Sequence, residues 1–359
     1  MSRIFVVGGG AVSPAGWNVT ALRQALDKGE PLPVQTIKRP GWEDPLQVRL
    51  VPAPSVRPVI LAHPRLRRTS PITHYAAAAA FEAVAGLQTH SDAILGRLGL
   101  IVCLQTGCVQ YSCRFFDETL KNPATASPLV FPETVYAAPA SHVSALLENV
   151  ILTYSLVGDG SAFLQGVSVG VQWLQDNRVD ACLVIGAEET NWIIADALRH
   201  FDRHAIATAG AGALCLCRET KHSSGVELAA ITDSHAYSAR QARKQAAAAM
   251  RHQLGNSSPE ELLCDGLGNG LRTDEAERAA WWDWRGPRLS PKRILGEGLM
   301  ALAAWQCVAA CDAVATGRVP GASVSLVGSN QQAIGARFVR ACFGRPRFSA
   351  GQSVGNSPS

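Results

Sequence analysis

The chain opens with Arg3-Ile4-Phe5-Val6-Val7-Gly8-Gly9-Gly10, an apolar run that ends in three glycines. β-Branched and aromatic residues favour a strand, and the glycines predict a turn directly after it. A helix is predicted next, over residues 20–28. A dinucleotide-binding turn is disfavoured, because the run lacks the third glycine of that motif and no helix begins at once.

Strands and helices alternate along the rest of the chain. Apolar runs predict strands over 98–104, 179–185, 211–217, 226–231 and 323–327, and helical spacing predicts helices over 70–87, 112–120, 161–175, 274–284 and 298–314. This alternation predicts an α/β protein made of two similar αβ halves, with mixed sheets sandwiched by helices. We expect an N-terminal half over 1–221, a C-terminal half over 222–345 and a flexible tail over 346–359.

Composition excludes several classes of protein. The 359 residues are 47% hydrophobic, which is enough for a large core without staples. Lys and Arg number 33 against 29 Asp and Glu, and no basic stripe suggests a nucleic-acid partner. No long apolar run or signal peptide is evident, so we expect no membrane span and a cytoplasmic location. The ten cysteines lack metal-site spacing, so no metal and no cofactor are expected.

Four segments, in this order and at these separations, resemble the β-ketoacyl synthases, the condensing enzymes of fatty acid and polyketide synthesis. The segments are residues 6–16, 127–135, 138–142 and 180–189. The first resembles the first strand and loop of the family, the next two precede its nucleophile helix, and the last follows that helix. The likeness covers roughly residues 3–340. It implies the thiolase-like fold of that family.

The catalytic positions of the family are replaced. Active members place a cysteine at the N-terminus of a buried helix, where the helix dipole favours the thiolate. Aligned on Leu164 and Gln165, that position falls on Gly160, which has no nucleophile to form an acyl-enzyme. The two histidines of the family correspond to Asp265 and Glu297, although the lysine upstream of the second is retained as Lys292.

The glycine-rich loop that helps to form the oxyanion hole in the family corresponds to residues 328–332 and is absent. A negative group at Glu297 would repel a malonyl carboxylate where the family has a neutral donor. The resemblance therefore implies a subunit with no independent condensing activity and no catalytic residues at Gly160, Asp265 and Glu297.

Such degenerate subunits, called chain length factors, pair with an active synthase in type II polyketide and aryl polyene systems. The resemblance implies a heterodimer with an active ketosynthase, or a homodimer, together with an acyl carrier protein. Its role would be to shape the acyl tunnel at the dimer interface. Gly160 departs from the glutamine common at this position in such partners, which argues against a decarboxylase.

The resemblance also implies which residues face the tunnel or the neighbouring subunit. The helix over 111–120 is similar to the partner helix that lines the tunnel, and Phe115 and Phe116 point to different faces of it. Tyr136 and His142 lie in the segment that crosses towards the neighbour, with His142 expected as a hydrogen-bonded interface residue. The arginines of residues 65–68 are candidates for contact with an acidic carrier protein.

Two alternatives remain open. Asp159, Asp265 and Glu297 would converge in the former active site, for acid/base chemistry on acyl thioesters or for binding a hard cation. Equally, Asp159 caps the helix that begins at 161, and the other two acids pair with Arg272, Lys292 or Arg293. A relocated nucleophile at Cys108 is also considered, whereas burial should keep Cys103 protonated and inert.

Overall fold

The computed structural model describes residues 2–88, 96–218, 225–238, 240–255, 258–268, 270, 274–329 and 331–341. Its strands are β1 (Phe5–Val12), β2 (Gln35–Ile37), β3 (Leu46–Arg49), β4 (Leu98–Leu104), β5 (Val150–Val157), β6 (Ala181–Glu188), β7 (Ala207–Thr208), β8 (Gly210–Cys217), β9 (Val226–Ile231), β10 (His235–Ala236), β11 (Leu262–Cys264), β12 (Arg288–Leu289), β13 (Gly321–Val327) and β14 (Gln332–Arg340). Its α-helices are α1 (Val19–Lys28), α2 (Pro71–Gln88), α3 (Val109–Lys121), α4 (Ala138–Leu147), α5 (Ala162–Gln175), α6 (Trp192–Phe201), α7 (Arg240–Leu254), α8 (Glu275–Ala280), α9 (Pro291–Leu295) and α10 (Met300–Ala315). Short 3-10 helices are η1 (Val59–Ala62), η2 (Pro64–Arg68), η4 (Pro123–Thr125) and η5 (Phe131–Thr134).

The two halves of the large sheet have the same strand order. The first half runs β5-β4-β6-β8-β1 and the second runs β12-β11-β13-β14-β9. In both, the second strand is parallel to its two neighbours and the fourth is antiparallel to its two neighbours. The halves meet where β1 pairs with β9, at Phe5 and Val6. The prediction of two similar αβ halves is confirmed; their expected join at 221/222 and the tail over 346–359 lie outside the described residues.

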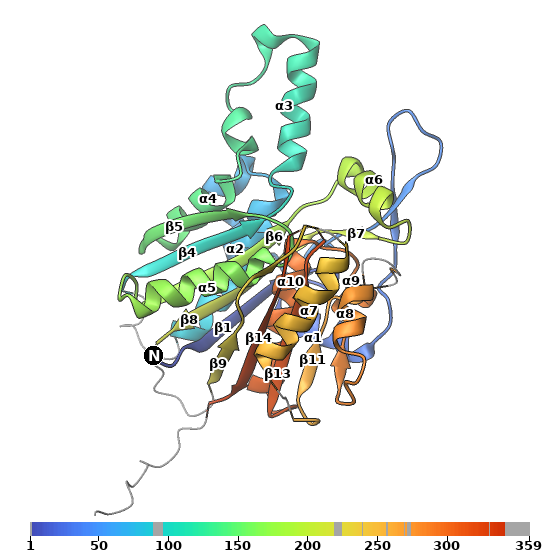
Figure 1. Ribbon diagram of the computed structural model, residues 1–359. Helices are drawn as coiled ribbons and strands as arrows, with labels where there is room; N and C mark the ends of the chain where they lie inside the picture. The colour runs from blue at the N-terminus through green and yellow to red at the C-terminus, as the bar shows by residue number, and fades with distance from the viewer. Residues whose placement is uncertain are drawn as a thin grey trace, which may run out of the picture.

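Helices cover the sheet in layers (Figure 1). α2 packs on one face of the first half, α5 and α10 lie between the halves, and α7 and α8 cover the outer face of the second half. Every residue of α10 except Asp312 and Ala315 is buried, as expected of a helix that is apolar on all sides. The indole Nε1 of Trp305 donates to the carbonyl oxygens of Val12 and Ala211, at 3.0 and 2.9 Å.

The glycine triplet is not the predicted turn. Gly8, Gly9 and Gly10 lie inside β1, and α2 crosses the strand at this point. A Cβ on Gly8 would lie 1.9 Å from the carbonyl oxygen of Ala83, and one on Gly10 would lie 1.9 Å from that of Ala79. Gly8 and Gly10 are therefore needed because another backbone approaches closely, which is the second common reason for glycine in a strand.

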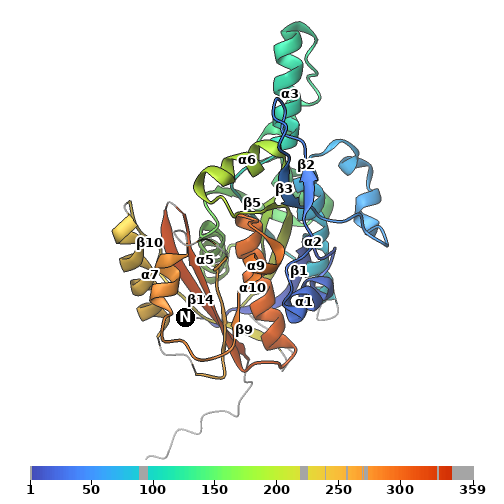
Figure 2. The ribbon, with the colours of Figure 1, turned by 90° about the vertical axis from the view of Figure 1, so that its right-hand side faces the viewer.

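One segment stands away from the body of the molecule. Residues 109–137, here called the α3 arm, comprise α3, η4 and η5, and they project from the sheet in both views (Figures 1 and 2). No residue of α3 is buried. Beside the base of the arm, β5 forms the end of the sheet. None of the described helices is long and apolar enough to cross a membrane.

The glycine triplet gives a matched test of the packing of β1 against α2. We expect Gly8→Ala to lower the free energy of unfolding by at least about 3 kcal/mol, because its Cβ would overlap the Ala83 carbonyl. Gly9→Ala is the control, since its Cβ would meet its nearest neighbour at 3.8 Å and should cost about 1 kcal/mol or less. Urea unfolding of both variants measures the difference, and equal losses would contradict this account.

Candidate functional site

A cavity of about 280 Å³ gathers several of the predicted positions. Gly160 lines it from the start of α5, Lys292 from α9 and Glu297 from the turn before α10. Further walls come from the end of β4, from α6, from the N-terminal part of α7 and from the end of β13. Both halves of the fold therefore contribute to one cavity.

Gly160 faces a backbone carbonyl. A Cβ at this position would lie 3.1 Å from the carbonyl oxygen of Leu299, which is tighter than ordinary van der Waals contact. Leu299 has φ 50° and ψ −116°, a backbone conformation that is strained for a residue with a side chain. A side chain at position 160 would thus press on Leu299, the N-cap residue directly before α10.

Asp159 occupies the N-terminus of α5. It is 5% exposed, and its Oδ1 accepts hydrogen bonds from the backbone N–H of Ser161, at 3.2 Å, and from the Ser161 hydroxyl. A negative group at this end of a helix is favoured by the helix dipole. Asp159 therefore has the capping role that the sequence left open, and it does not line the cavity.

Lys292 and Glu297 form an ion pair in the cavity wall. The Lys292 Nζ lies 2.6 Å from Glu297 Oε2 and 4.0 Å from Asp274 Oδ1. Burial lowers the pKa of Lys292, but Glu297 and Asp274 outweigh this effect and leave the pKa above its usual value. The other Glu297 oxygen accepts the backbone N–H of Leu299 at 3.0 Å. Both oxygens of Glu297 are thus engaged at the entrance to α10.

Asp265 is fully buried and does not line the cavity. Its Oδ1 accepts from the Ser290 hydroxyl at 2.6 Å and from the Leu267 N–H at 3.1 Å. Its ion-pair partner is Arg288, at 3.2 Å, rather than the predicted Lys292 or Arg293; Arg272 is outside the described residues.

The predicted convergence of three acids is therefore wrong. Among Asp159, Asp265 and Glu297, only Glu297 lines the cavity. Asp159 and Asp265 instead accept hydrogen bonds from other groups, Asp159 from Ser161 and Asp265 from Leu267 and Ser290.

Two acids that sequence reasoning missed, Asp274 and Glu277, line the cavity instead. Glu277 is buried and accepts hydrogen bonds from the Ser325 hydroxyl and the Gly266 N–H. Burial, with a contribution from Asp265, raises the pKa of Glu277 to about 8, which favours its protonated form. The sequence did contain a signal for Glu277: it is an acid between Ala276 and Ala280, on the apolar side of the helix predicted over 274–284.

α6 forms one apolar side of the cavity. Ile194, Ala197, Leu198 and Phe201 line it and follow one another at helical spacing. From outside the cavity, Arg39 holds this helix through an ion pair with Asp196 at 2.8 Å.

The predicted tunnel and interface residues all lie on the α3 arm or in α4, away from the cavity. Phe115 packs on Phe131 within the arm, with ring centroids 5.3 Å apart, whereas Phe116 is 61% exposed. Tyr136 is exposed at the base of the arm. His142 Nε2 lies 2.9 Å from a carboxylate oxygen of Glu133, which ties the arm to α4.

Cys108 is not a relocated nucleophile. It is 1% exposed, and burial, with Glu189 and Glu133, raises the pKa of its thiol well above the usual value. The thiolate is therefore disfavoured. Cys103 is likewise fully buried in β4, and burial raises the pKa of its thiol, as the sequence predicted.

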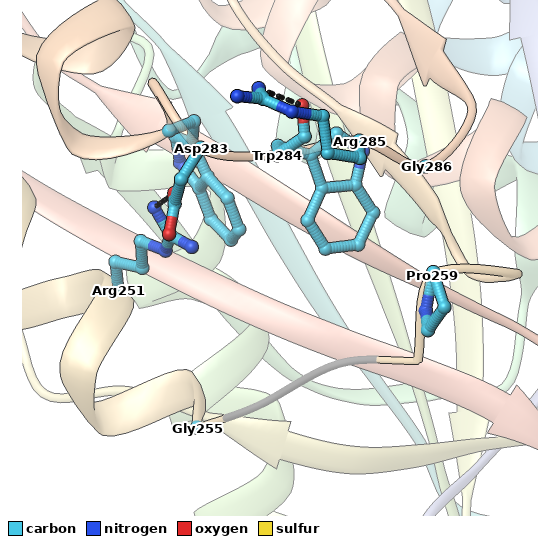
Figure 3. Close-up of a pocket in the computed structure, with 8 residues that line it drawn as sticks. Arg251, Gly255, Pro259, Asp283, Trp284, Arg285 and Gly286 are labelled. Atoms are coloured by element: carbon cyan, nitrogen blue, oxygen red, sulfur yellow. Dashed lines mark hydrogen bonds and ion pairs between the residues drawn. The ribbon is translucent and has the colours of Figure 1, made fainter.

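A second, smaller pocket of about 210 Å³ lies at the end of α7 (Figure 3). The Trp281 and Trp284 rings meet edge to face in its wall, with centroids 5.7 Å apart. Arg251 lies over the Trp281 ring at 4.8 Å and pairs with Asp283. The charges of Arg251 and Asp283 are thus satisfied by each other. In the described part of the chain, no group of three or more His, Cys, Asp or Glu residues could hold a metal ion.

The proton on Glu277 gives a testable pH dependence. Between about pH 5 and pH 8 the unfolded chain releases this proton while the folded chain keeps it, so the wild type loses stability as pH rises. Glu277→Gln removes this pH-dependent loss of stability. The free energy of unfolding of the variant, relative to that of the wild type, should therefore rise by up to about 1.4 kcal/mol per pH unit and level off above pH 8. Urea unfolding at pH 5, 6, 7 and 8 measures this, with the exposed Glu260→Gln as control. Parallel profiles for the wild type and Glu277→Gln would contradict the assignment.

Comparison of the sequence with family models and with curated proteins gave no match. Comparison of the structure with solved structures gave many. They include the ishigamide ketosynthase/chain length factor, with a TM-score of 0.75, 16% identity, and coverage of 95% of this chain and 99% of that one. A β-ketoacyl synthase from Burkholderia phymatum STM815 matches with a TM-score of 0.74, 17% identity, and coverage of 95% and 100%.

A third likeness is to the ketosynthase ApeO in complex with its chain length factor ApeC from Xenorhabdus doucetiae. The TM-score is 0.75 at 14% identity, and the alignment covers 95% of this chain and 98% of that one. Identities this low establish architecture alone. The chain therefore has the thiolase-like α/β fold of ketosynthases and chain length factors, as the sequence predicted.

Proposed function

We propose that this chain is a non-condensing subunit that pairs with an active ketosynthase and shapes the acyl tunnel at their interface, in fatty acid, polyketide or polyene synthesis. The observation that carries the proposal is Gly160. It stands where the sequence resemblance places the nucleophile, at the start of α5, and it offers neither a reactive atom nor ordinary room for a Cβ. Without a nucleophile no acyl-enzyme forms.

The surroundings of Gly160 also argue against condensation by this chain. The Asp159 carboxylate already accepts the Ser161 N–H at the N-terminus of α5, where a thiolate would need that favourable field. Glu297 places a negative charge in the cavity wall, where the resemblance expects a neutral donor. Glu297 is paired with Lys292 and accepts hydrogen bonds at both oxygens, so it does not donate one to a malonyl carboxylate or a developing enolate.

Exposed apolar side chains on the surface of the chain favour the presence of a second subunit. β5 forms the end of the large sheet, and three of its apolar side chains are about half exposed: Ile151, Tyr154 and Val157, here called the β5 edge surface. A long, apolar edge strand invites pairing or aggregation unless something covers it. Phe116 and Leu120 of the α3 arm add further exposed apolar area. We assign the partner to this combined surface.

The partner that we propose for this surface is an active synthase rather than a second copy of this chain. A homodimer would join two subunits that both have glycine at the nucleophile position, so neither could carry the acyl chain through condensation. Similar structures include a ketosynthase with its chain length factor, and a type II polyketide acyl-carrier protein with its ketosynthase. For the carrier protein we propose contact with the exposed arginines of η2, Arg65, Arg67 and Arg68.

We propose different roles for Phe115, Phe116 and His142, because their surroundings differ. Phe115 is engaged with Phe131 inside the α3 arm and supports its shape. Phe116 is 61% exposed, so it is the candidate for contact with the partner or its tunnel. His142 fixes the arm through Glu133 and serves as a positioning residue rather than a base.

Native mass spectrometry tests the partnership. We expect this chain, co-expressed with a condensing enzyme from the same gene neighbourhood, to form a one-to-one heterodimer. Ile151→Lys should weaken that heterodimer at least about tenfold, because it places a charge on the β5 edge surface. Val59→Lys is the control, since Val59 is 91% exposed on η1, outside this surface.

Two outcomes would contradict the proposal. One is a population of homodimers that does not exchange subunits with the synthase on mixing. The other is a heterodimer that Ile151→Lys and Val59→Lys affect equally.

A further inference from the structure

The α3 arm begins beside a buried turn of another part of the chain. Because β4 and β6 are parallel neighbours, their carboxyl ends lie at the same edge of the sheet, where the chain continues into α3 and α6 (Figure 1). Residues 188–191, here called the β6–α6 turn, include Glu188 and Glu189, each 1% exposed. Burying a carboxylate costs free energy unless hydrogen-bond donors replace water. Several of these donors come from the root of the arm.

Glu189 binds the first turn of the arm's helix. Its Oε1 accepts the N–H of Gln110 at 2.6 Å, and its two oxygens also accept the Ser70 hydroxyl and the Ile72 N–H at the start of α2. The Gln110 side chain donates in return to the carbonyl oxygen of Thr190, at 3.2 Å. α3 packs mainly on η4 and η5 and has no buried residue, so these contacts at its first turn do much to set its direction.

Glu188 holds the segment that leads from the cavity to the arm. It accepts the N–H of Gln105, the N–H of Thr106 at 3.1 Å and the Thr106 hydroxyl. Gln105 and Thr106 both line the cavity. Gly107 follows with φ 67°, a left-handed conformation that suits glycine, and there the chain turns from the cavity wall into the arm.

Asn191 joins the arm to the helix on the other side of the cavity. Its Oδ1 caps α6 by accepting the N–H of Ile194 at 3.1 Å, and Ile194 lines the cavity. Its side-chain N–H donates to the sulfur of Cys113 in α3, at 3.2 Å. One short turn therefore holds the start of α3, the start of α6 and the cavity wall between them.

We infer that the β6–α6 turn fixes the arm relative to the cavity wall, and that Glu189 is the residue that positions the arm for the partner. Phe116 and Leu120, which we assign to the partner surface, belong to the helix whose first turn Glu189 holds. The importance of the arm for pairing rests on the proposed function, whereas the hold on the arm belongs to this chain alone. The two are therefore tested separately.

Hydrogen exchange of the full chain alone, followed by mass spectrometry, tests the hold on the arm. Glu189→Gln replaces an acceptor oxygen by an amide NH2, which leaves one of the converging N–H donors without an acceptor. We expect exchange over residues 109–121 to become about tenfold faster, while exchange in α5 stays the same. Glu82→Gln is the matched control, because Glu82 also accepts two backbone N–H groups, those of Ala11 and Val19, outside the arm.

Unchanged exchange over residues 109–121 in Glu189→Gln, or equal acceleration in the arm and in α5, would overturn the inference. If Glu189→Gln does not fold, Gln110→Ala takes its place, because it removes the hydrogen bond to Thr190 from the side of the arm.

Partner affinity separates this inference from the proposed function. In native mass spectrometry of the heterodimer, Glu189→Gln should raise the dissociation constant at least about tenfold, whereas Glu82→Gln should leave it unchanged. Equal affinity of the two variants for the synthase would overturn the inference. A wild-type chain that forms no heterodimer would instead contradict the proposed function, and the exchange result would then decide whether Glu189 positions the arm.

A further variant tests the connection to the cavity wall. Asn191→Ala removes the α6 cap and the contact with Cys113 together, so exchange should become about threefold faster or more in the first turns of both α6 and α3. Asn18→Ala is the control, because it removes the equivalent cap of α1, where Asn18 accepts the Ala21 N–H at 2.7 Å, and should affect α1 alone. Faster exchange in α6 without any change in α3 would contradict the connection.

Discussion

The burial of α10 between the two halves of the sheet is the constraint on which the rest of the molecule depends. Trp305 donates its indole N–H to backbone oxygens of the β1–β8 region, so the helix is fixed to the first half while its other faces pack on the second. Its start is fixed as well, because Glu297 accepts the Leu299 N–H. The Leu299 carbonyl then faces Gly160. Packing in the core thus determines the space at the former nucleophile position.

Local pattern predicted much of this fold, and the failures have physical causes. The strand over 98–104 was predicted with its observed bounds, since seven consecutive buried apolar residues leave little choice. Gly8 to Gly10 were misjudged as a turn, because the carbonyls that require glycine at Gly8 and Gly10 belong to α2, some 70 residues away. β5 and α6 were not predicted, and each has an apolar side exposed at the proposed partner surface or in the cavity. The apolar side chains of β5 and α6 are not all buried in the core of this chain, so the usual core-facing periodicity did not reveal these elements.

The sequence predicted only part of the candidate site. Alignment to a family placed Gly160, Lys292 and Glu297 in sequence, and the fold brings these three to one cavity. Pairing among buried charges depends on side-chain geometry that sequence spacing does not contain. Asp265 consequently pairs with Arg288 rather than with Lys292, and Glu277 lines the cavity without having been considered.

The central claim is that all condensing chemistry of the complex resides in the partner. The most direct measurement is product formation by two purified complexes of this chain with its synthase. In one the synthase is intact, and in the other its nucleophilic cysteine is replaced by alanine. The account predicts extended product from the first complex and none from the second, because Gly160 offers no nucleophile. Extended product from the complex with the alanine-substituted synthase would contradict it.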